Sequence, residues 1–395
     1  MSSACLMPVY ERLPVHFVRG EGSCLWDDQG NQYLDSLAGV AVTNLGHSHP
    51  EITAAISAQA ATLMHSSNLY GVTWQETLAA TLCSLTGMEK AFFCNSGAEA
   101  NETAIKLARL HARQRQITAP QIVVMDGAFH GRTLATLTAS GNPAAQQGFE
   151  PLVPGFLRLP LNDSTALNAL DGNPQICAVL LETVQGEGGV RLADSHYLQA
   201  LARLCRANNW LLMIDEVQTG MGRTGRHFGY QHADIQPDVI TLAKGLGNGL
   251  PIGACLARGA AANLFAPGQH GSTFGGNPLA CRVGHTVISI MQRDRLAERA
   301  AELGRQLLEG LTQALAGHPQ VAAIRGRGLM VGIELKEAIP DLTRRALLEE
   351  RLLINVTRQK VIRLLPALTI SPEEISILIA ALSRLLHSNQ QLRSA

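Results

Sequence analysis

The chain has 395 residues, 46% of them hydrophobic, and its 32 Lys and Arg balance its 32 Asp and Glu to a formal net charge of zero. This length predicts two or three domains with a core that needs no disulfide staples. The balanced charge provides no bulk field for nucleic acid, so we expect no nucleic-acid partner, and the hydrophobic content excludes a disordered chain.

No apolar run approaches the roughly 20 residues of a membrane helix. The first residues, MSSACLMPVYERLPVHF, lack the basic and then apolar order of a secretory signal. The eight cysteines include no C-x-x-C pair, and several lie in apolar runs, as free thiols in a reducing compartment do. We therefore expect a cytoplasmic protein with no membrane partner.

In chain order, the first element is a strand pair around a turn in 23–35. The string GHSHP follows, in which His47 and His49 could form a metal pair. Two histidines without nearby Asp, Glu or Cys ligands favour a turn instead, so we expect no metal site.

The middle of the chain alternates short apolar runs with helical patterns, which predicts an α/β doubly wound domain. The runs are nearly continuous, as in strands buried on both faces of a mostly parallel sheet. Strands are predicted over 91–95, 121–126, 176–182, 210–217, 238–244 and 252–257, and helices over 100–114 and 195–209.

The end of the chain has an α+β pattern. A long helix is expected over 295–315, strands over 329–335 and 361–366, and a helix closes the chain. We predict three parts: an N-terminal segment of residues 1–50, a large domain of 51–284 and a small domain of 285–395.

Residues 91–109, AFFCNSGAEANETAIKLAR, predict a strand, a Ser-Gly turn and a helix. Ser96 and Glu99 fit an S-x-x-E capping box, and the same helix start suits a phosphate through its backbone N–H groups and dipole. No base or ribose pocket is evident, so a compact phosphorylated cofactor fits better than a nucleotide.

The string DGAFHGRTLATL follows another strand. Phe129 could stack on a flat cofactor or cap the core, and Arg132 could hold a carboxylate by a bidentate pair. Glu187 follows a third strand, and Arg363 lies in the apolar run VIRLLPAL. Because buried charges need partners, Glu187 and Arg363 are a candidate ion pair.

Asp215 ends the apolar strand in WLLMIDEVQTGMGRTG. This string resembles a Walker-B strand and a G-x-G-x-x-G fingerprint, but no G-x-x-x-x-G-K-[ST] string occurs and loop-like residues follow the glycines. A nucleotide-dependent enzyme is thereby disfavoured. Asp215 itself is either a cap, an ion-pair member or a functional group at the ligand-binding edge of the sheet.

Lys244 ends the strand in DVITLAKGLGNG. Burial lowers the pKa of a lysine, which prepares it for Schiff-base chemistry, whereas the alternative is a snorkelling side chain. The loop HGSTFGGNP presents Ser272 and Thr273 either to a ligand or merely at a surface turn.

Taken together and in this order, the strings NSGAEANETA, FHGRT, E-x-x-QGEGG, DEVQTGMGRTG, AKGLGNG and STFGGNP resemble the class III (subgroup II) aminotransferases. The resemblance runs from about Pro8 to the last helix. It implies pyridoxal 5'-phosphate on a fold-type-I scaffold, with a seven-stranded, mostly parallel sheet flanked by helices and a smaller α+β domain. It also implies a homodimer with shared active sites.

Under this resemblance Lys244 would bind the cofactor as a Schiff base and shuttle a proton, and Asp215 would pair with the pyridinium nitrogen. Gln218 would form a hydrogen bond with the ring's phenolic oxygen. Thr273 would reach the phosphate of the cofactor that is bound in the partner subunit. Lys244 and Asp215 would be the two catalytic residues. The other cofactor contacts would be Ser96, Gly97, Ala98, Phe129, Glu216, Val217, Gln218 and Thr273.

The substrate residues implied by the resemblance are Arg132, for the donor's α-carboxylate, with Ser272 nearby, and the pair Glu187 and Arg363. Glu187 would cover Arg363 while the donor reacts and release it to bind the α-carboxylate of 2-oxoglutarate. The cycle would be ping-pong through pyridoxamine phosphate.

Within the class the resemblance is closest to the branch that acts on N2-acetylornithine in arginine biosynthesis. Thr183 lies directly after the first glutamate of the E-x-x-QGEGG string, where a proline is often found. We expect this difference to cause only a local backbone change. Val40 lies where ornithine enzymes tend to carry a tyrosine that contacts the free α-amino group, which favours an acylated donor. The alternatives are succinylornithine, succinyl-diaminopimelate, ornithine and 4-aminobutyrate.

Overall fold

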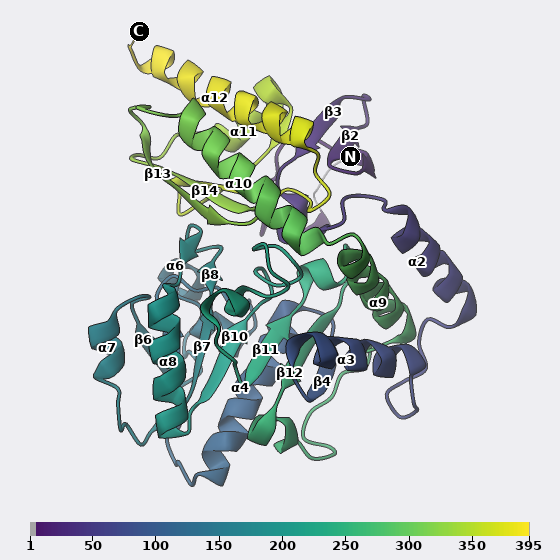
Figure 1. Ribbon diagram of the computed structural model, residues 1–395, viewed down its shortest axis with the longest axis vertical. Coiled ribbons are helices and arrows are strands. Elements are labelled where there is room, and N and C mark those ends of the chain that lie inside the picture. Colours follow the sequence, from purple (N-terminus) through teal and green to yellow (C-terminus); the bar gives the residue numbers. More distant parts are fainter. Residues whose placement is uncertain (1–4, 395) are drawn as a thin grey trace.

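A seven-stranded sheet forms the centre of the larger part of the chain in the computed structural model, which describes residues 5–394 (Figure 1). The strands are parallel except for one, which pairs antiparallel with both of its neighbours. This confirms the predicted α/β class. In sheet order they are β4 (Lys90–Cys94), β12 (Gly253–Ala257), β11 (Val239–Leu242), β10 (Leu211–Asp215), β7 (Ile176–Glu182), β5 (Gln121–Met125) and β6 (Phe156–Leu159).

Both faces of this sheet are buried, because successive side chains of a strand point to opposite faces. In β10, Leu211 and Met213 join the apolar cluster that contains α4, whereas Leu212 and Ile214 join the cluster that contains α8, α3 and α9. These helices span α4 (Gly97–Gln114), α8 (Ser195–Asn208), α3 (Thr73–Thr86) and α9 (Pro278–Arg293), and the preceding α2 (Pro50–Thr62) lies beside α9. The continuous apolar runs of the sequence follow from this double burial.

Short elements connect the strands of the large sheet. They are the helices α5 (Leu134–Ala139), α6 (Pro143–Gln146) and α7 (Ser164–Asn168), the two-stranded pair β8 (Val184–Gln185) and β9 (Arg191–Leu192), and the 3-10 helices η2 (Gly229–Ala233), η3 (Lys244–Leu246) and η4 (Gly259–Asn263). Two predicted strands end earlier than expected. Val217 lies in the turn after β10, and Lys244 begins η3.

A second body, with a four-stranded antiparallel sheet, follows α9 (Figure 1). Its strands are β13 (Val321–Arg327), β14 (Met330–Leu335), β17 (Val361–Leu364) and β16 (Asn355–Thr357) in sheet order, and its helices are α10 (Leu296–Ala314), α11 (Leu342–Glu350) and α12 (Pro372–Ser394). The helices α10 and α12 pack together, and α10 also packs on β13. This arrangement fits the predicted α+β pattern.

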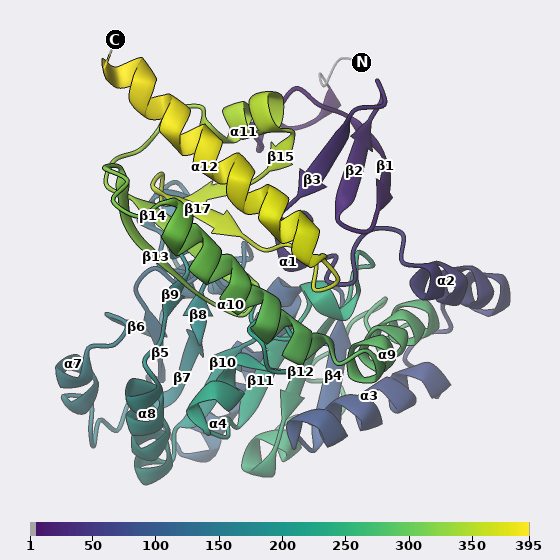
Figure 2. The same ribbon diagram turned by 45° about the horizontal axis from the view of Figure 1, so that its top comes forward.

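The N-terminal strands share a sheet with the C-terminal part of the chain (Figure 2). The order is β1 (Phe17–Glu21), β2 (Cys24–Asp27), β3 (Gln32–Asp35) and β15 (Leu352–Leu353), with β3 and β15 parallel. The short helix α1 (Ala38–Ala41) then leads to the large body. Residues 1–4 of the predicted N-terminal segment lie outside the described residues, and the domain boundaries stay a prediction.

Within residues 5–394, no helix combines the length and the apolar character that a membrane crossing requires. The same residues contain no group of three or more His, Cys, Asp and Glu side chains arranged to hold a metal ion. His47 instead pairs with Asp35, with 2.8 Å between His47 Nε2 and Asp35 Oδ2.

Arg223 joins the two bodies from a fully buried position. Its guanidinium donates to the backbone oxygens of Leu329 and Pro366, at 3.0 Å for Leu329, and to Asn44 Oδ1 at 2.6 Å. These three acceptors lie on segments that are distant in the sequence. Burial lowers the pKa of this arginine to about 9, because the charged form is desolvated.

We expect Arg223→Met to lower the free energy of unfolding by about 3 kcal/mol, since buried acceptors that lose their donor cost about 1–3 kcal/mol each. Urea denaturation followed by circular dichroism measures this change. Arg226→Met is the matched control, because Arg226 is exposed. Equal unfolding midpoints for the two variants would contradict the assigned role.

Candidate active site

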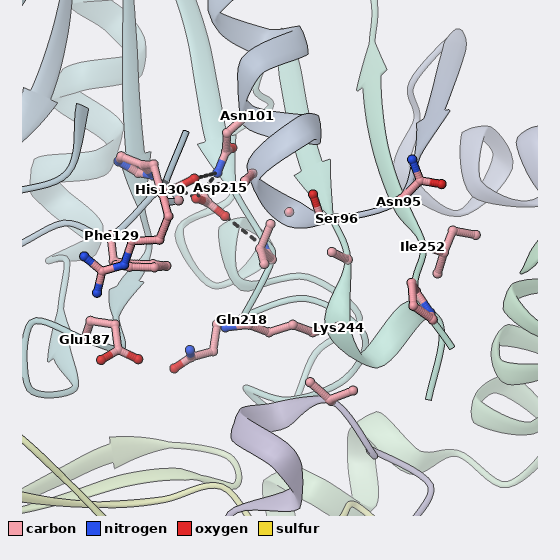
Figure 3. A pocket seen from close by; sticks show the side chains of 18 of the residues that line it. Asn95, Ser96, Asn101, Phe129, His130, Glu187, Asp215, Gln218, Lys244 and Ile252 are labelled. Atoms are coloured by element: carbon pink, nitrogen blue, oxygen red, sulfur yellow. Dashed lines mark hydrogen bonds and ion pairs between the residues drawn. The ribbon is translucent and has the colours of Figure 1, made fainter. Parts of the chain in front are cut away.

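A cavity of about 430 Å³ lies at the carboxyl ends of the central strands and beside the start of α4 (Figure 3). Most of the residues that the sequence singled out line it. Its lining includes Ser96, Gly97, Ala98, Phe129, Arg132, Glu187, Asp215, Val217, Gln218 and Lys244, together with Val42, Asn95, Asn101, His130, Glu182, Leu250 and Ile252.

Asp215 is the last residue of β10, and only 3% of it is exposed. Its Oδ2 accepts from Asn101 Nδ2 at 2.7 Å and lies 2.7 Å from His130 Nδ1 (Figure 3). Its Oδ1 accepts from the backbone N–H of Val217 at 3.0 Å. Asn101 is oriented in turn by Thr241 Oγ1, which donates to Asn101 Oδ1 at 2.7 Å. The carboxylate is therefore fixed by donors from three separate elements.

Sequence reasoning assigns no role to Asn101 or His130. The signal is present, because both belong to the strings NSGAEANETA and FHGRT, and Asn101 lies on the buried face of α4. Because the Asp215 carboxylate is an acceptor, His130 Nδ1 must carry a hydrogen atom and donate it.

Lys244 lies two residues after β11, with a backbone φ of 45° in the left-handed region. Its side chain is half-buried and lines the cavity, and its Nζ forms no hydrogen bond or ion pair with any residue that the structure describes. Burial, with the positive charge of Arg363 as the next cause, lowers the pKa of Lys244 to about 8. Such an amine is a competent nucleophile near neutral pH.

The first turn of α4 forms one wall of the cavity. Ser96 caps the helix, with its Oγ accepting from the backbone N–H of Glu99 at 3.2 Å. The Glu99 carboxylate accepts from Ser96 Oγ at 3.0 Å and from the backbone N–H of Asn95 at 2.8 Å. The predicted capping is confirmed, with the glutamate reaching one residue further back than the cap.

Gly97 brings this helix start close to the segment after β10. A Cβ on Gly97 would lie 2.7 Å from Val217 Cγ1, so only glycine fits there. Gly97 and Ala98 both line the cavity, and the first N–H groups of a helix have no partner within it. The wall therefore offers backbone donors and a positive dipole end to an anion.

The loop after β5 brings Phe129 and Arg132 to the cavity. The Arg132 guanidinium lies over the Phe129 ring, 5.1 Å from its centroid. Glu182, at the end of β7, accepts from the backbone N–H of Phe129 at 2.8 Å and of Gly186 at 3.3 Å. Glu182 thus ties the loop of Phe129 to the loop that carries Glu187, and burial raises its pKa.

The predicted ion pair of Glu187 and Arg363 is present, with 2.6 Å between Glu187 Oε1 and Arg363 Nη1. Arg363 is 1% exposed, whereas the Glu187 side chain is 38% exposed. Arg363 also donates to Gln218 Oε1 at 3.3 Å and, through Nη2, to Asn355 Oδ1 at 2.8 Å. The arginine is fixed by neutral partners, and its charged partner borders the open cavity.

Besides Arg363, three residues expected at the site are not among those that line the cavity. The Glu216 carboxylate accepts from Thr219 Oγ1 and from the backbone of η2, which organises the loop after β10, and burial raises its pKa to about 7. Ser272 lies nearby, where its Oγ accepts from Asn95 Nδ2 at 3.3 Å. Thr273 is exposed on the same loop.

The expectation that Val40 favours an acylated donor stays a prediction. Val40 packs beside a small apolar cluster that contains Val184 and Val190, and it is not among the lining residues of the cavity. Val42, two residues further along, lines the cavity instead. Val42 places an apolar side chain at the site beside this segment.

Comparisons with known proteins agree on one family. The profile of the Aminotransferase class-III family matches residues 7–386. The chain is 53% identical over 382 residues to acetylornithine aminotransferase of Nitrosomonas europaea, a match that covers 96% of this chain and 97% of that protein. It is 52% identical to acetylornithine aminotransferase 1 of Bordetella pertussis, covering 99% and 100%.

Solved structures give the same result. The ornithine aminotransferase of Toxoplasma gondii superposes with a TM-score of 0.95 at 34% identity, covering 98% of this chain and 94% of that one. The acetylornithine aminotransferase of Elizabethkingia anophelis superposes with a TM-score of 0.88 at 36% identity, covering 97% and 96%.

The lowered pKa of Lys244 predicts how the cofactor-free protein reacts with an amine-directed reagent. Labelling of Lys244 should rise to half its maximal rate near pH 8, because the amine loses its proton there, rather than near the ordinary lysine value of about 10.4. Peptide mapping across a pH series measures this, with the exposed Lys336 as the internal reference. A half-maximal pH for Lys244 equal to the ordinary value would contradict the assigned environment.

Proposed function

The chain belongs to the class-III aminotransferases, which depend on pyridoxal 5'-phosphate, and we propose that it transfers the 5-amino group of N2-acetylornithine to 2-oxoglutarate. The products are N-acetylglutamate 5-semialdehyde and glutamate. The observation that carries the chemistry is an unpaired amine, Lys244, and a buried carboxylate, Asp215, that line one cavity. The donor is inferred from curated relatives that share 45–53% identity over nearly the whole chain. We place the reaction in arginine biosynthesis in the cytoplasm, where the free cysteines would stay reduced.

The cavity suits pyridoxal phosphate in shape and in donor set. The start of α4, pressed against Val217 through Gly97, would hold the phosphate, and Phe129 would cover one face of the ring. Asp215 would meet the ring nitrogen, and Gln218 the phenolic oxygen. When bound, the cofactor supplies an electron sink for the electrons of a substrate C–H bond.

The chain's own groups then divide the proton transfers. Lys244 would hold the cofactor through Nζ, and its amine, when free, would move the proton of the substrate's reacting C–H bond. An amine with a pKa near 8 suits this role, because it both accepts and donates protons near neutral pH. Asp215, oriented by Asn101 and His130, would keep a proton on the ring nitrogen.

Two differently shaped substrates require two arrangements of charge. N2-acetylornithine reacts at its terminal amine, and its distant carboxylate would meet Arg132. 2-Oxoglutarate carries a carboxylate directly beside its reacting carbon, which would bind Arg363 after Glu187 turns away. The 38% exposure of the Glu187 side chain leaves room for that movement, while Asn355 and Gln218 keep Arg363 in place.

We also propose that the active enzyme is a homodimer. Large apolar side chains are exposed around the loop of Thr273, namely Leu69 at 86%, Tyr70 at 70% and Phe274 at 62%. Asn68 connects these segments by donating to the backbone oxygen of Ser272 at 2.9 Å. A second copy on this face would cover them, and Thr273 of the partner subunit would reach the phosphate end of the cavity.

Ornithine is the second candidate donor, since solved ornithine aminotransferases superpose on this chain with TM-scores up to 0.95. The lining favours the acylated donor. Val42, Leu250 and Ile252 place apolar groups on the cavity wall, and none of them can pair with a free α-ammonium.

We expect the highest kcat/KM in a donor panel for N2-acetylornithine, followed by N2-succinylornithine, with ornithine, succinyl-diaminopimelate and 4-aminobutyrate lower. Ornithine should be at least about tenfold poorer, because an ammonium desolvated without a partner costs at least about 1–3 kcal/mol. Loss of the visible absorbance of the bound cofactor measures the donor half-reaction. A preference for free ornithine would overturn the proposed donor.

We expect Glu187→Ala to raise the use of α-amino donors such as glutamate relative to N2-acetylornithine, because Arg363 is then uncovered throughout the cycle. The ratio of the two kcat/KM values measures the change, and the affinity for the cofactor should stay close to wild type. Glu51→Ala, which breaks a surface pair with Arg293, is the matched control. An unaltered ratio for Glu187→Ala would remove the argument for a movable glutamate.

A further inference from the structure

Two side chains, His270 of the loop and Lys106 of helix α4, attach the loop that carries Thr273 to this helix. The two ring nitrogens of His270 contact two residues of α4 that lie almost one turn apart. His270 Nε2 is 2.9 Å from Thr103 Oγ1, and His270 Nδ1 is 2.9 Å from Lys106 Nζ. Lys106 Nζ also donates to the backbone oxygen of Gln269 at 2.8 Å.

These contacts define a single hydrogen-bond arrangement. A lysine ammonium only donates, so His270 Nδ1 must be the acceptor, and Nε2 then carries the hydrogen that Thr103 accepts. The Thr103 hydroxyl donates in turn to the backbone oxygen of Glu99 at 2.8 Å. The arrangement requires a neutral imidazole, in agreement with the burial and the Lys106 charge that lower the pKa of His270.

Two aromatic rings fix the plane of this imidazole. The Phe92 ring centroid lies 4.7 Å from that of His270, and the Phe265 ring stacks on it at 5.4 Å. Asn68 donates to the backbone oxygens of Ser272 and Gly275, which flank Thr273, each at 2.9 Å. The segment between the two attachments is held at both ends, yet the Thr273 side chain is exposed and does not line the cavity of its own subunit.

We propose that His270, oriented by Lys106, is a positioning residue that presents Thr273 to the active site of the partner subunit. This inference rests on the proposed homodimeric function. Helix α4 begins at the phosphate wall of its own cavity, at Gly97 and Ala98, and holds His270 further along the same rigid element. Helix α4 thereby positions groups for two active sites, one in its own subunit and one in the partner subunit.

Hybrid dimers test this inference. Two differently tagged chains are co-expressed, one of which carries Lys244→Ala, so that each purified hybrid retains one live site. That site uses Thr273 from the Lys244→Ala chain. His270→Phe removes both hydrogen bonds but keeps a ring between Phe92 and Phe265, and it is placed either in the Lys244→Ala chain or in the chain with the intact lysine.

We expect His270→Phe in the Lys244→Ala chain to raise the dissociation constant for pyridoxal phosphate at the live site by about tenfold, the effect of a lost hydrogen bond to a charged group. The same substitution in the chain with the intact lysine should change that constant less than about twofold. Lys106→Met should reproduce this asymmetry. Equal effects in the two placements, or no effect in either, would overturn the proposal.

Thr273→Ala in the Lys244→Ala chain separates this inference from the proposed function beneath it. It should weaken cofactor binding at least as much as His270→Phe, and the double substitution should weaken it no further, because His270 acts through Thr273. If Thr273→Ala has no effect, the shared site itself fails. If it has an effect and His270→Phe has none, only the role of His270 fails.

Discussion

A single buried carboxylate, that of Asp215, is the constraint on which the arrangement of the site depends. At 3% exposure it cannot rely on water, so the fold must supply donors. They come from helix α4 through Asn101, from the loop after β5 through His130, and from the chain's own turn through Val217. Elements that are far apart in the sequence meet at this atom group, and the cavity is the space that they enclose. A site organised in this way is rigid before any ligand enters, which is what electrostatic catalysis requires.

The strand register of the large sheet also brings site residues together. Asp215 on β10 lies opposite Glu182 on β7 and Thr241 on β11. Because the three strands are parallel and end together, their last side chains come to one edge. The three side chains then have different roles, since Asp215 lines the cavity, Thr241 orients Asn101, and Glu182 holds the backbone of Phe129. Hydrogen bonds within the sheet thus align the site as well as stabilise the fold.

The sequence predicted these strands to within about three residues, because double burial makes them continuous apolar runs. It missed β6 and β13, whose side chains are mostly half-buried or exposed and carry no such pattern. The direction of β12 could not be predicted either, since an antiparallel strand buried on both faces has the same composition as a parallel one.

Charged residues at strand ends could also be recognised from the sequence as candidate site residues, because a charge directly after a buried apolar strand must be paired or functional. Neutral polar residues could not be recognised in this way. Asn101 is defined as a site residue by Asp215, which lies 114 positions further along the chain, and its polar side chain on the buried face of α4 does not by itself identify that partner. The family resemblance implied Glu216 as a cofactor contact, whereas its carboxylate accepts from the backbone of Gly229 and Tyr230. Neighbours in sequence need not share a face.

Two buried arginines show how partners separate a structural charge from a functional one. Arg223 donates to two backbone oxygens and one amide, all of which belong to the folded chain, so no ligand can replace them without unfolding. Arg363 is held by the amides of Asn355 and Gln218, but its charge is neutralised by Glu187, which is partly exposed at the cavity. The buried charge of Arg363, unlike that of Arg223, has a carboxylate partner, and another carboxylate of suitable reach could take its place. The carboxylate of a substrate can therefore exchange with Glu187 at little net electrostatic cost, because one bidentate-capable acceptor replaces another. Under the proposed function, the neutral partners of Arg363 would keep its geometry during the exchange, and a single site would then accept a donor that leaves the arginine covered and an acceptor that binds it.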